Sequence, residues 1–237
     1  MGQAVEAVAA ERGHAVVARF DAAAPLLDAR DDAALNGADV VVDFSLPALA
    51  PDHIHRYAAW GADAVVGTTG WTDELDRVRA WVEEGGAGLI WAPNFSLGLA
   101  LVERALRAML PLLDELDDYD VSVHEIHHTG KVDSPSGTAL RLADVLLGGV
   151  ARKTHVEAEA QHGPIDAAAL HVTSQRLGSV LGEHTVTLDS PVDTIELVHR
   201  AKSRRAFAVG AVRAAEWVRG RRGLFTLDDM LGGGMEG

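Results

Sequence analysis

Apolar positions in the first part of the chain alternate between strand spacing and helix spacing. Short, almost wholly apolar runs are separated by segments in which apolar residues recur every three or four positions. The predicted strands are Ala15–Asp21, Val40–Phe44, Ala64–Gly67 and Leu89–Pro93, and the predicted helices are Met1–Ala10, Ala48–Trp60 and Asp73–Glu84. Apolar strands that alternate with helices are typical of a parallel sheet that helices cover on both faces.

The pattern changes after a long predicted helix, Leu97–Glu115. An alternating run, Asp120–His124, predicts a strand with Val121 and Val123 on its buried face, and a helix is predicted to open at Ser136. Three later strands follow one another without intervening helices: His171–Arg176, His184–Leu188 and Thr194–His199. Strands joined in this way are at least partly antiparallel, so the sequence predicts a mixed sheet. The chain closes with a predicted helix over Ser203–Val218, a short element over Gly223–Leu231 and a mobile tail at Gly232–Gly234.

Composition and charge restrict the class of protein. The 237 residues are 48% hydrophobic and 24% charged, which suits a globular chain of two modest domains. No cysteine is present, so disulfides and thiolate metal sites are excluded. Because the sequence shows neither a secretory leader nor a long apolar run, we expect a cytoplasmic protein that does not enter membranes. The net charge of −14 argues against nucleic-acid binding.

Small and hydroxyl-bearing residues follow three of the predicted parallel strands. The strand ends read Phe44-Ser45, Gly67-Thr68-Thr69-Gly70 and Ala92-Pro93-Asn94-Phe95-Ser96. Ligands of parallel sheets lie beyond the carboxyl ends of the strands, where glycines allow close approach and hydroxyl or amide groups can bind a ribose or a carboxamide. Each segment alone also fits an ordinary turn, but three along one edge favour a nucleotide site.

The start of the chain has the spacing of a dinucleotide-binding unit. In such a unit a glycine-rich turn precedes a helix, and an acidic residue about 20 residues later accepts hydrogen bonds from the adenosine ribose. Gly2 and Asp21 fit this interval, although Asp21 alone also suits a turn. The first strand and most of the glycine-rich turn, expected before Gly2, are not in the sequence. We expect either that translation starts upstream of Met1 or that a short chain binds its cofactor weakly.

The segment from His127 to Thr138 carries the densest set of reactive groups in the chain. His127 and His128 can donate protons near neutral pH, and Lys131 adds a positive charge. The helix predicted to open at Ser136 would present the unpaired N–H groups of its first turn, which favour a carboxylate or phosphate. This combination predicts a site that binds an anionic small molecule and protonates it. The alternative is that the serine or threonine only caps the helix and that the histidines are surface residues.

Six motifs in collinear order resemble those of the dihydrodipicolinate reductase family, also called 4-hydroxy-tetrahydrodipicolinate reductases, of lysine and diaminopimelate biosynthesis. They are Val42-Asp43-Phe44-Ser45, Gly67-Thr68-Thr69-Gly70-Trp71, Ala92 through Gly98, Glu125 through Ala139, Gly182-Glu183-His184-Thr185, and Ser203 through Val212. The resemblance runs from Met1 to about Leu231. The block of histidines and lysine is its most specific part.

The resemblance implies an α/β fold with two domains. A Rossmann-like domain with a parallel sheet, whose first strand is missing here, would comprise residues 1–97 and 206–237, and an α+β domain with a mixed sheet would comprise residues 98–205. The second domain would bind the substrate and assemble the chain into a homotetramer. The implied reaction is the reduction of a dicarboxylate, 4-hydroxy-tetrahydrodipicolinate, to tetrahydrodipicolinate by NADH or NADPH.

The resemblance also assigns roles to individual residues. His127 corresponds to the proton donor and Lys131 to the catalytic lysine, while His128, Gly137 and Thr138 correspond to substrate-binding residues. The cofactor contacts correspond to Asp21, Gly67, Thr68, Thr69, Ala92, Pro93, Asn94 and Phe95. The mechanism expected from these roles is hydride transfer from the cofactor, followed by a proton from His127.

Three further expectations concern cofactor preference and competing functions. A carboxylate at Asp21 favours NADH over NADPH, although Arg19 and Arg30 could offset its repulsion of a 2′-phosphate. A reductase of another anionic amino-acid precursor and a non-catalytic nucleotide-binding regulator stay open as alternatives. A metal site at the histidines is not expected, because Glu125 is placed on the opposite strand face from the neighbouring histidines.

Overall fold

The computed structural model describes residues 1–232, which form two compact units. One unit comprises Met1–Leu97 together with the chain from Arg204 onward, and the other comprises Gly98–Ser203. The tail predicted to be mobile at Gly232–Gly234 lies almost wholly outside the described residues. Among the described residues, no helix combines the length and the apolar character needed to cross a membrane.

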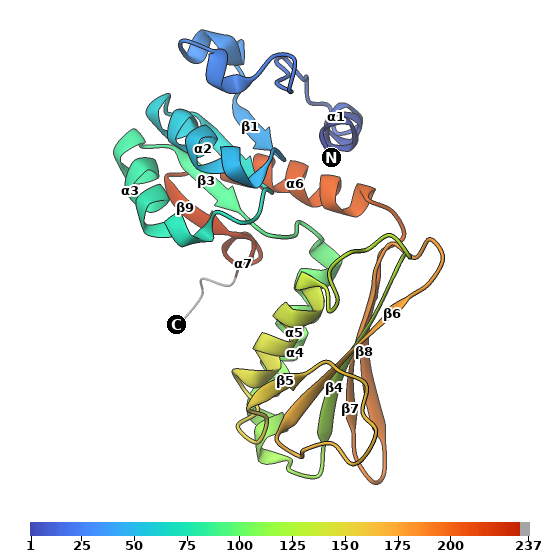
Figure 1. Ribbon diagram of the computed structural model, residues 1–237. Coiled ribbons are helices and arrows are strands. Elements are labelled where there is room, and N and C mark those ends of the chain that lie inside the picture. The colour runs from blue at the N-terminus through green and yellow to red at the C-terminus, as the bar shows by residue number, and fades with distance from the viewer. Residues whose placement is uncertain (233–237) are drawn as a thin grey trace. The chain divides into compact units, whose positions relative to one another are not determined.

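The first unit is built on a sheet of four parallel strands (Figure 1). The strands are β1 (Val40–Asp43), β2 (Asp63–Val66), β3 (Gly88–Trp91) and β9 (Gly223–Thr226), in the order β1-β2-β3-β9. Val65, Val66 and Ile90 are wholly buried, so both faces of the sheet are covered. The parallel sheet expected from the apolar runs is confirmed, and the short closing element supplies its fourth strand.

Helices pack on both faces of this sheet. The helices of this unit are α1 (Gly2–Glu11), α2 (Ala50–Ala59), α3 (Leu75–Gly85), α6 (Arg205–Val218) and α7 (Leu227–Met230). Short 3₁₀ turns occur at Leu26–Asp28, Asp32–Leu35, Pro47–Leu49 and Thr72–Glu74. Helices α2 and α3 contact each other and share a core with Ala64, Val66 and Leu89, whereas α6 contacts β1, β2 and β3 and carries α1. A methyl group on Gly210 of α6 would overlap the carbonyl oxygen of Phe95, so only glycine allows this close packing.

The strand predicted over Ala15–Asp21 does not form. The residues between α1 and the first 3₁₀ turn have no regular structure, and β1 is the edge of the sheet on that side. A strand exists only where a neighbour completes its ladder of hydrogen bonds, and the described residues place none beside this segment. Apolar character alone was therefore an insufficient signal here.

The second unit has a mixed sheet of five strands. They are β5 (His155–Glu157), β6 (Ala169–Arg176), β4 (Asp120–His127), β7 (Glu183–Asp189) and β8 (Thr194–Arg200), in the order β5-β6-β4-β7-β8. The central strand β4 runs parallel to β6 and antiparallel to β7. The mixed sheet is confirmed, while the short strand β5 was not anticipated.

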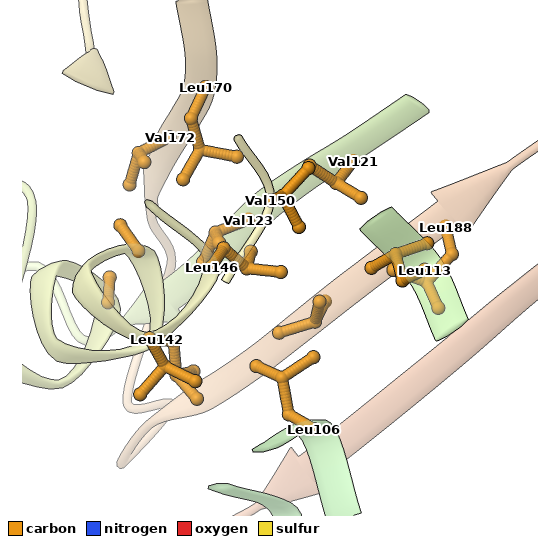
Figure 2. Close-up of a cluster of buried hydrophobic side chains, with 14 of the residues drawn as sticks. Leu106, Leu113, Val121, Val123, Leu142, Leu146, Val150, Leu170, Val172 and Leu188 are labelled. Carbon is orange, nitrogen blue, oxygen red and sulfur yellow. The ribbon is translucent and has the colours of Figure 1, made fainter. Parts of the chain in front are cut away.

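Two helices, α4 (Leu97–Glu115) and α5 (Gly137–Leu147), cover one face of the mixed sheet (Figure 1). On α5 the buried residues Ala139, Leu142, Ala143 and Leu146 recur at helical spacing and meet the apolar side of the sheet. Figure 2 shows Leu146 beside Val123, and Leu142 and Val172 belong to the same buried cluster. This core holds β4 and the start of α5 in fixed positions, which matters for the residues described next.

Candidate functional site

The buried face of β4 changes from apolar to polar along the strand. Its buried residues are Val121, Val123, Glu125 and His127, at every second position. Successive side chains of a strand point to opposite faces, so residues two apart share one. The valines belong to the core, and Glu125 and His127 continue the same face beyond it. The expectation that Glu125 points away from the histidines is therefore wrong for His127.

His127 and Glu125 form a close, buried pair. The imidazole Nδ1 and the carboxylate Oε2 lie 2.5 Å apart, and the two side chains are 8% and 0% exposed. Neither atom meets the directional geometry of a hydrogen bond, so electrostatic attraction is the main force between them once the ring is protonated. The other ring nitrogen, Nε2, faces Gly182, where an added Cβ would come within 3.0 Å of it.

Glu125 also holds two groups outside its own strand. Its Oε1 accepts a hydrogen bond from the backbone N–H of Ser136 at 3.0 Å and one from the guanidinium of Arg176 at 3.1 Å. Burial opposes ionisation of the carboxyl, but hydrogen bonding from Ser136 and the charge of His127 outweigh it and lower its pKa to about 2. Glu125 is thus a buried carboxylate whose charge is compensated by Ser136, His127 and Arg176.

His184 completes the cluster from the adjacent strand. It lies opposite Glu125 in the pairing of β4 and β7, and its ring packs edge-on against that of His127 with centroids 5.1 Å apart. Its Nε2 is 3.2 Å from the hydroxyl of Ser136. Burial and the neighbouring His127 lower the pKa of His184 to about 4, so the ring is neutral at neutral pH.

His127 is placed to give up a proton readily. Burial lowers its pKa below the ordinary value for histidine, and the positive charges of Lys131 and Arg176 act in the same direction. The charge of Glu125 opposes them. A protonated His127 therefore releases its proton more readily than a solvated histidine, as a general acid requires.

Helix α5 begins beside this cluster, as the sequence predicted. Ser136 is its N-cap, and the serine hydroxyl accepts a hydrogen bond from the N–H of Ala139 at 3.2 Å. An added Cβ on Gly137 would meet no atom within 4 Å, so open space lies against the first helical residue. Thr138 is half-buried beside it. The start of α5 therefore combines helix-dipole polarity with room for an anion.

Lys131 and His128 lie in the loop between β4 and α5. The ammonium of Lys131 forms an ion pair with Asp133, whose carboxylate has a lowered pKa because of Lys131 and, further, the backbone N–H of Gly137. An internal carboxylate thus already engages two of the groups expected to hold an anionic ligand. His128 is half-buried, and its carbonyl oxygen accepts a hydrogen bond from the N–H of Lys131 at 3.1 Å. Asp133 is not among the residues predicted from the sequence.

Three buried side chains within residues 1–232 have the composition of a metal site. Ligand atoms of Glu125, His127 and His184 all lie within 4.8 Å of one another. Zinc binds nitrogen and oxygen ligands at about 2.0–2.2 Å. Ligand atoms around one tetrahedral zinc ion are therefore closer to one another than the 4.8 Å found here. Glu125 is also already paired with Arg176 and Ser136. The arrangement suits proton transfer better than metal coordination.

The residues predicted to contact the cofactor lie in the first unit. Gly67, Thr68 and Thr69 follow β2, where the N–H of Gly67 donates to the carbonyl of Asp43 at 2.8 Å. Thr68 is buried with its hydroxyl 3.5 Å from the Asp43 carboxylate, whereas Thr69 is exposed. Of the two threonines, Thr69 therefore offers the accessible hydroxyl.

The segment after β3 presents backbone rather than side chains. Ala92 and Phe95 are buried, and the Phe95 ring packs edge-on against Phe44 with centroids 6.2 Å apart. Pro93 is exposed, and the Asn94 side chain accepts a hydrogen bond from the N–H of Ser96 at 2.7 Å. Small groups and backbone amides at the ends of neighbouring parallel strands fit a nicotinamide nucleotide.

Asp21 lies in an exposed bend. Its Oδ1 accepts hydrogen bonds from the N–H groups of Ala23 and Ala24 at 2.8 and 3.0 Å. This is the behaviour of a turn residue, the alternative interpretation of Asp21.

A buried network that was not predicted from the sequence supports the edge at which the cofactor is predicted to bind. Asp43, the last residue of β1, accepts hydrogen bonds from His53 at 2.9 Å, from the Tyr57 hydroxyl at 2.8 Å and from the N–H of Ser45 at 2.7 Å. Burial opposes ionisation of Asp43, but these bonds lower its pKa. The network fixes the carboxyl end of β1 next to Thr68.

Comparison with known families covers nearly the whole chain. The family described as "Dihydrodipicolinate reductase, N-terminus" matches residues 1–95, and "Dihydrodipicolinate reductase, C-terminus" matches residues 98–231. The chain is 36% identical to the 4-hydroxy-tetrahydrodipicolinate reductase of Christiangramia forsetii over 233 residues, which are 98% of this chain and 93% of that one. It is 37% identical to the Neisseria gonorrhoeae reductase of the same name over 206 residues, 85% of this chain and 75% of that one.

Solved structures show the same fold. A dipicolinate-bound dihydrodipicolinate reductase from a Paenisporosarcina species has a TM-score of 0.68 and 22% identity, with 82% of this chain and 74% of that chain covered. An amine dehydrogenase from Mycobacterium smegmatis has a TM-score of 0.57 at 12% identity, with 96% and 92% covered.

Proposed function

The chain belongs to the dihydrodipicolinate reductase family, and we propose that it reduces 4-hydroxy-tetrahydrodipicolinate with NADH or NADPH, using the polar end of β4 and the start of α5 as its substrate site. It is an oxidoreductase of lysine and diaminopimelate biosynthesis. The observation that carries the residue assignment is the single cluster that joins His127, a buried carboxylate and the N-cap of α5.

The start of α5 and Lys131 bind one carboxylate of the substrate. The N–H groups of Gly137 and Thr138 belong to the first turn of the helix, and the dipole favours negative charge there. Lys131 contributes a full charge once it exchanges Asp133 for the substrate. His128 lies in the loop between these groups and assists the same carboxylate side.

His127 is the proton donor. A bound reduced nicotinamide would supply hydride to the unsaturated ring that is left once the 4-hydroxyl of the substrate has departed as water, and the reduced ring would then need a proton. The Nε2 of His127 is the ring nitrogen that faces away from Glu125, and its N–H donates this proton to the substrate. The lowered pKa of His127 favours that release.

The first unit holds the nicotinamide nucleotide. Its family match is the N-terminal domain, and the groups available are the backbone of Gly67, Ala92 and Pro93 and the hydroxyl of Thr69. Asp21 would have to release two backbone N–H groups to bind a ribose. A comparison of turnover with NADH and NADPH tests its role, since a carboxylate there disfavours a 2′-phosphate.

The mixed sheet is the surface we assign to assembly. Helices α4 and α5 lie over one face (Figure 1), and half-exposed residues such as Ser122, His124 and Thr173 alternate with the buried ones. A homotetramer formed through this face would cover it. Sedimentation of the purified protein gives its mass in solution.

The function is tested by the loss of absorbance of NADH or NADPH with freshly made substrate and with other cyclic or linear amino-acid precursors. His127→Gln should lower kcat by about 10²–10⁴-fold with little change in KM, because the ring acts in the transition state rather than in binding. Full turnover of the His127→Gln protein would remove His127 from the acid role. Turnover only of another precursor would overturn the substrate assignment.

A further inference from the structure

Two buried polar side chains beside His127 have no part in the chemistry described so far. Glu125 is wholly buried, and His184 is 6% exposed. A buried carboxylate is unfavourable unless its partners compensate for lost water. A chain that needed only a stable sheet would place a valine at position 125, continuing Val121 and Val123 on the same face. The charge therefore calls for a functional explanation.

The two oxygens of Glu125 serve different partners. Oε1 accepts hydrogen bonds from the Ser136 N–H and from Arg176, and Oε2 lies 2.5 Å from the Nδ1 of His127. Ser136 is the N-cap of α5, so one rigid carboxylate contacts both the proton donor and the helix that binds the anion. The Nε2 of His184 lies 3.2 Å from the hydroxyl oxygen of the same serine.

We propose that Glu125 is a positioning residue, which holds the His127 ring with Nδ1 directed at the Glu125 carboxylate and Nε2 directed at the substrate. Glu125 also fixes the start of α5 at a constant distance from that Nε2. His184 gives a second support to the start of α5 through Ser136. This inference rests on the proposed function. The proton that leaves is the one on Nε2. The proton on Nδ1 stays on the neutral ring, and solvent restores the Nε2 proton after product release.

The 2.5 Å separation already brings Nδ1 within hydrogen-bonding reach of Oε2, so only the orientation of the ring has to change for Nδ1–H to be directed at the carboxylate. Gly182 keeps the Nε2 side clear, since a Cβ there would lie 3.0 Å from that nitrogen.

Glu125→Gln tests the proposal, because it keeps the volume and removes the charge. We expect kcat to fall by between about 10-fold and about 10⁴-fold, the range for loss of a carboxylate that orients a histidine. KM should change by less than kcat. Nitrogen NMR of the neutral His127 ring should show protonation at Nδ1 in the wild type and a mixture of both tautomers in Glu125→Gln.

The pH profile provides a second readout. The charged groups that face His127 are Glu125, Lys131 and Arg176, with His184 neutral beside it. Of these, only Glu125 raises the pKa of His127. Turnover needs protonated His127, so kcat declines as pH rises through that pKa. In Glu125→Gln the decline should move to lower pH.

Glu103→Gln is the matched control. Glu103 is also buried, at 3% exposed, and is paired with Arg141 at 2.8 Å in the same unit. Loss of the Glu103 charge should lower the stability of the fold without changing the pH dependence of kcat or the tautomer of His127. A pH profile and tautomer in Glu125→Gln that match those of Glu103→Gln would overturn the proposal.

A second variant and the tautomer measurement keep the test decisive. If Glu125→Gln does not fold, Glu125→Asp is used instead, because it keeps the charge but withdraws it from Nδ1. Glu125→Asp should lower kcat and reduce the fraction of the neutral His127 ring that is protonated at Nδ1. A wild-type kcat together with a wild-type tautomer fraction in Glu125→Asp would contradict the positioning role. The tautomer measurement needs no turnover, so failure of the assigned reaction and failure of the positioning role are distinguished.

Discussion

Replacing Gly137 with alanine separates the proposed ligand-binding role of the start of α5 from its structural role. An added Cβ would meet no protein atom within 4 Å, so the folded chain accommodates it without strain. Alanine is also the better helix former, and we expect unfolding stability to stay equal or rise by up to ~1 kcal/mol. The space that the methyl group takes is the space in which the proposed function places the substrate carboxylate.

The kinetic effect follows from the loss of that approach. A hydrogen bond from a backbone N–H to a carboxylate contributes about 1.5–3 kcal/mol. Each 1.4 kcal/mol is a factor of about ten, so Gly137→Ala should raise KM roughly 10- to 100-fold. The effect on kcat should be small, because His127 and Glu125 do not move.

Steady-state kinetics and urea unfolding of the same preparation measure both quantities. Gly163→Ala is the control, since Gly163 is an exposed loop residue of the same unit whose Cβ would also meet nothing within 4 Å. It should leave KM unchanged. Wild-type KM in Gly137→Ala would refute the placement of the substrate carboxylate at this helix. A raised KM with a large loss of stability would attribute the effect to misfolding.

Further predictions concern the loop and the buried histidine. Lys131→Ala should raise KM and lower kcat, because the charge orients the ring in both ground and transition states. Asp133→Asn should instead lower KM, since Asp133 competes for Lys131; a raised KM would mean that Asp133 positions the lysine. The pKa of His184 is lowered from 6.5 to about 4, so the unfolded chain binds the extra proton. Stability should be fully present above pH 6.5 and fall by on the order of 3 kcal/mol towards pH 4, and His184→Gln should flatten that decline in urea titrations.

The sequence predicted the elements that carry their own signals. The apolar runs at β1, β2 and β3 and the helical spacing of α4 and α5 are strong local patterns, and all are found close to the predicted bounds. Ser136 was recognisable as a helix start, and it is the N-cap. These features depend on neighbours in the chain, which is the information that a single sequence contains.

Features that depend on distant partners were missed. Ala15–Asp21 has the composition of a strand but no neighbouring strand among the described residues. Asp133 sits two residues from Lys131, yet only the folded loop brings its carboxylate to the ammonium and to the N–H of Gly137. His184 was visible as part of a motif, but its position opposite Glu125 follows from the register of β4 and β7.

The prediction for Glu125 was wrong although the sequence contains the signal for its position. The alternation that predicts Val121 and Val123 on the buried face continues to the strand's last residues and places Glu125 and His127 on that same face. A polar residue at a position that the pattern marks as buried carries a large cost in free energy. Such a residue is kept where its charge has a function. A strand whose buried positions change from apolar to polar residues, while the alternation of buried and exposed positions continues, therefore indicates a functional site. In this chain that point is the end of the central strand, which α5 and the neighbouring strands hold rigid on the apolar side.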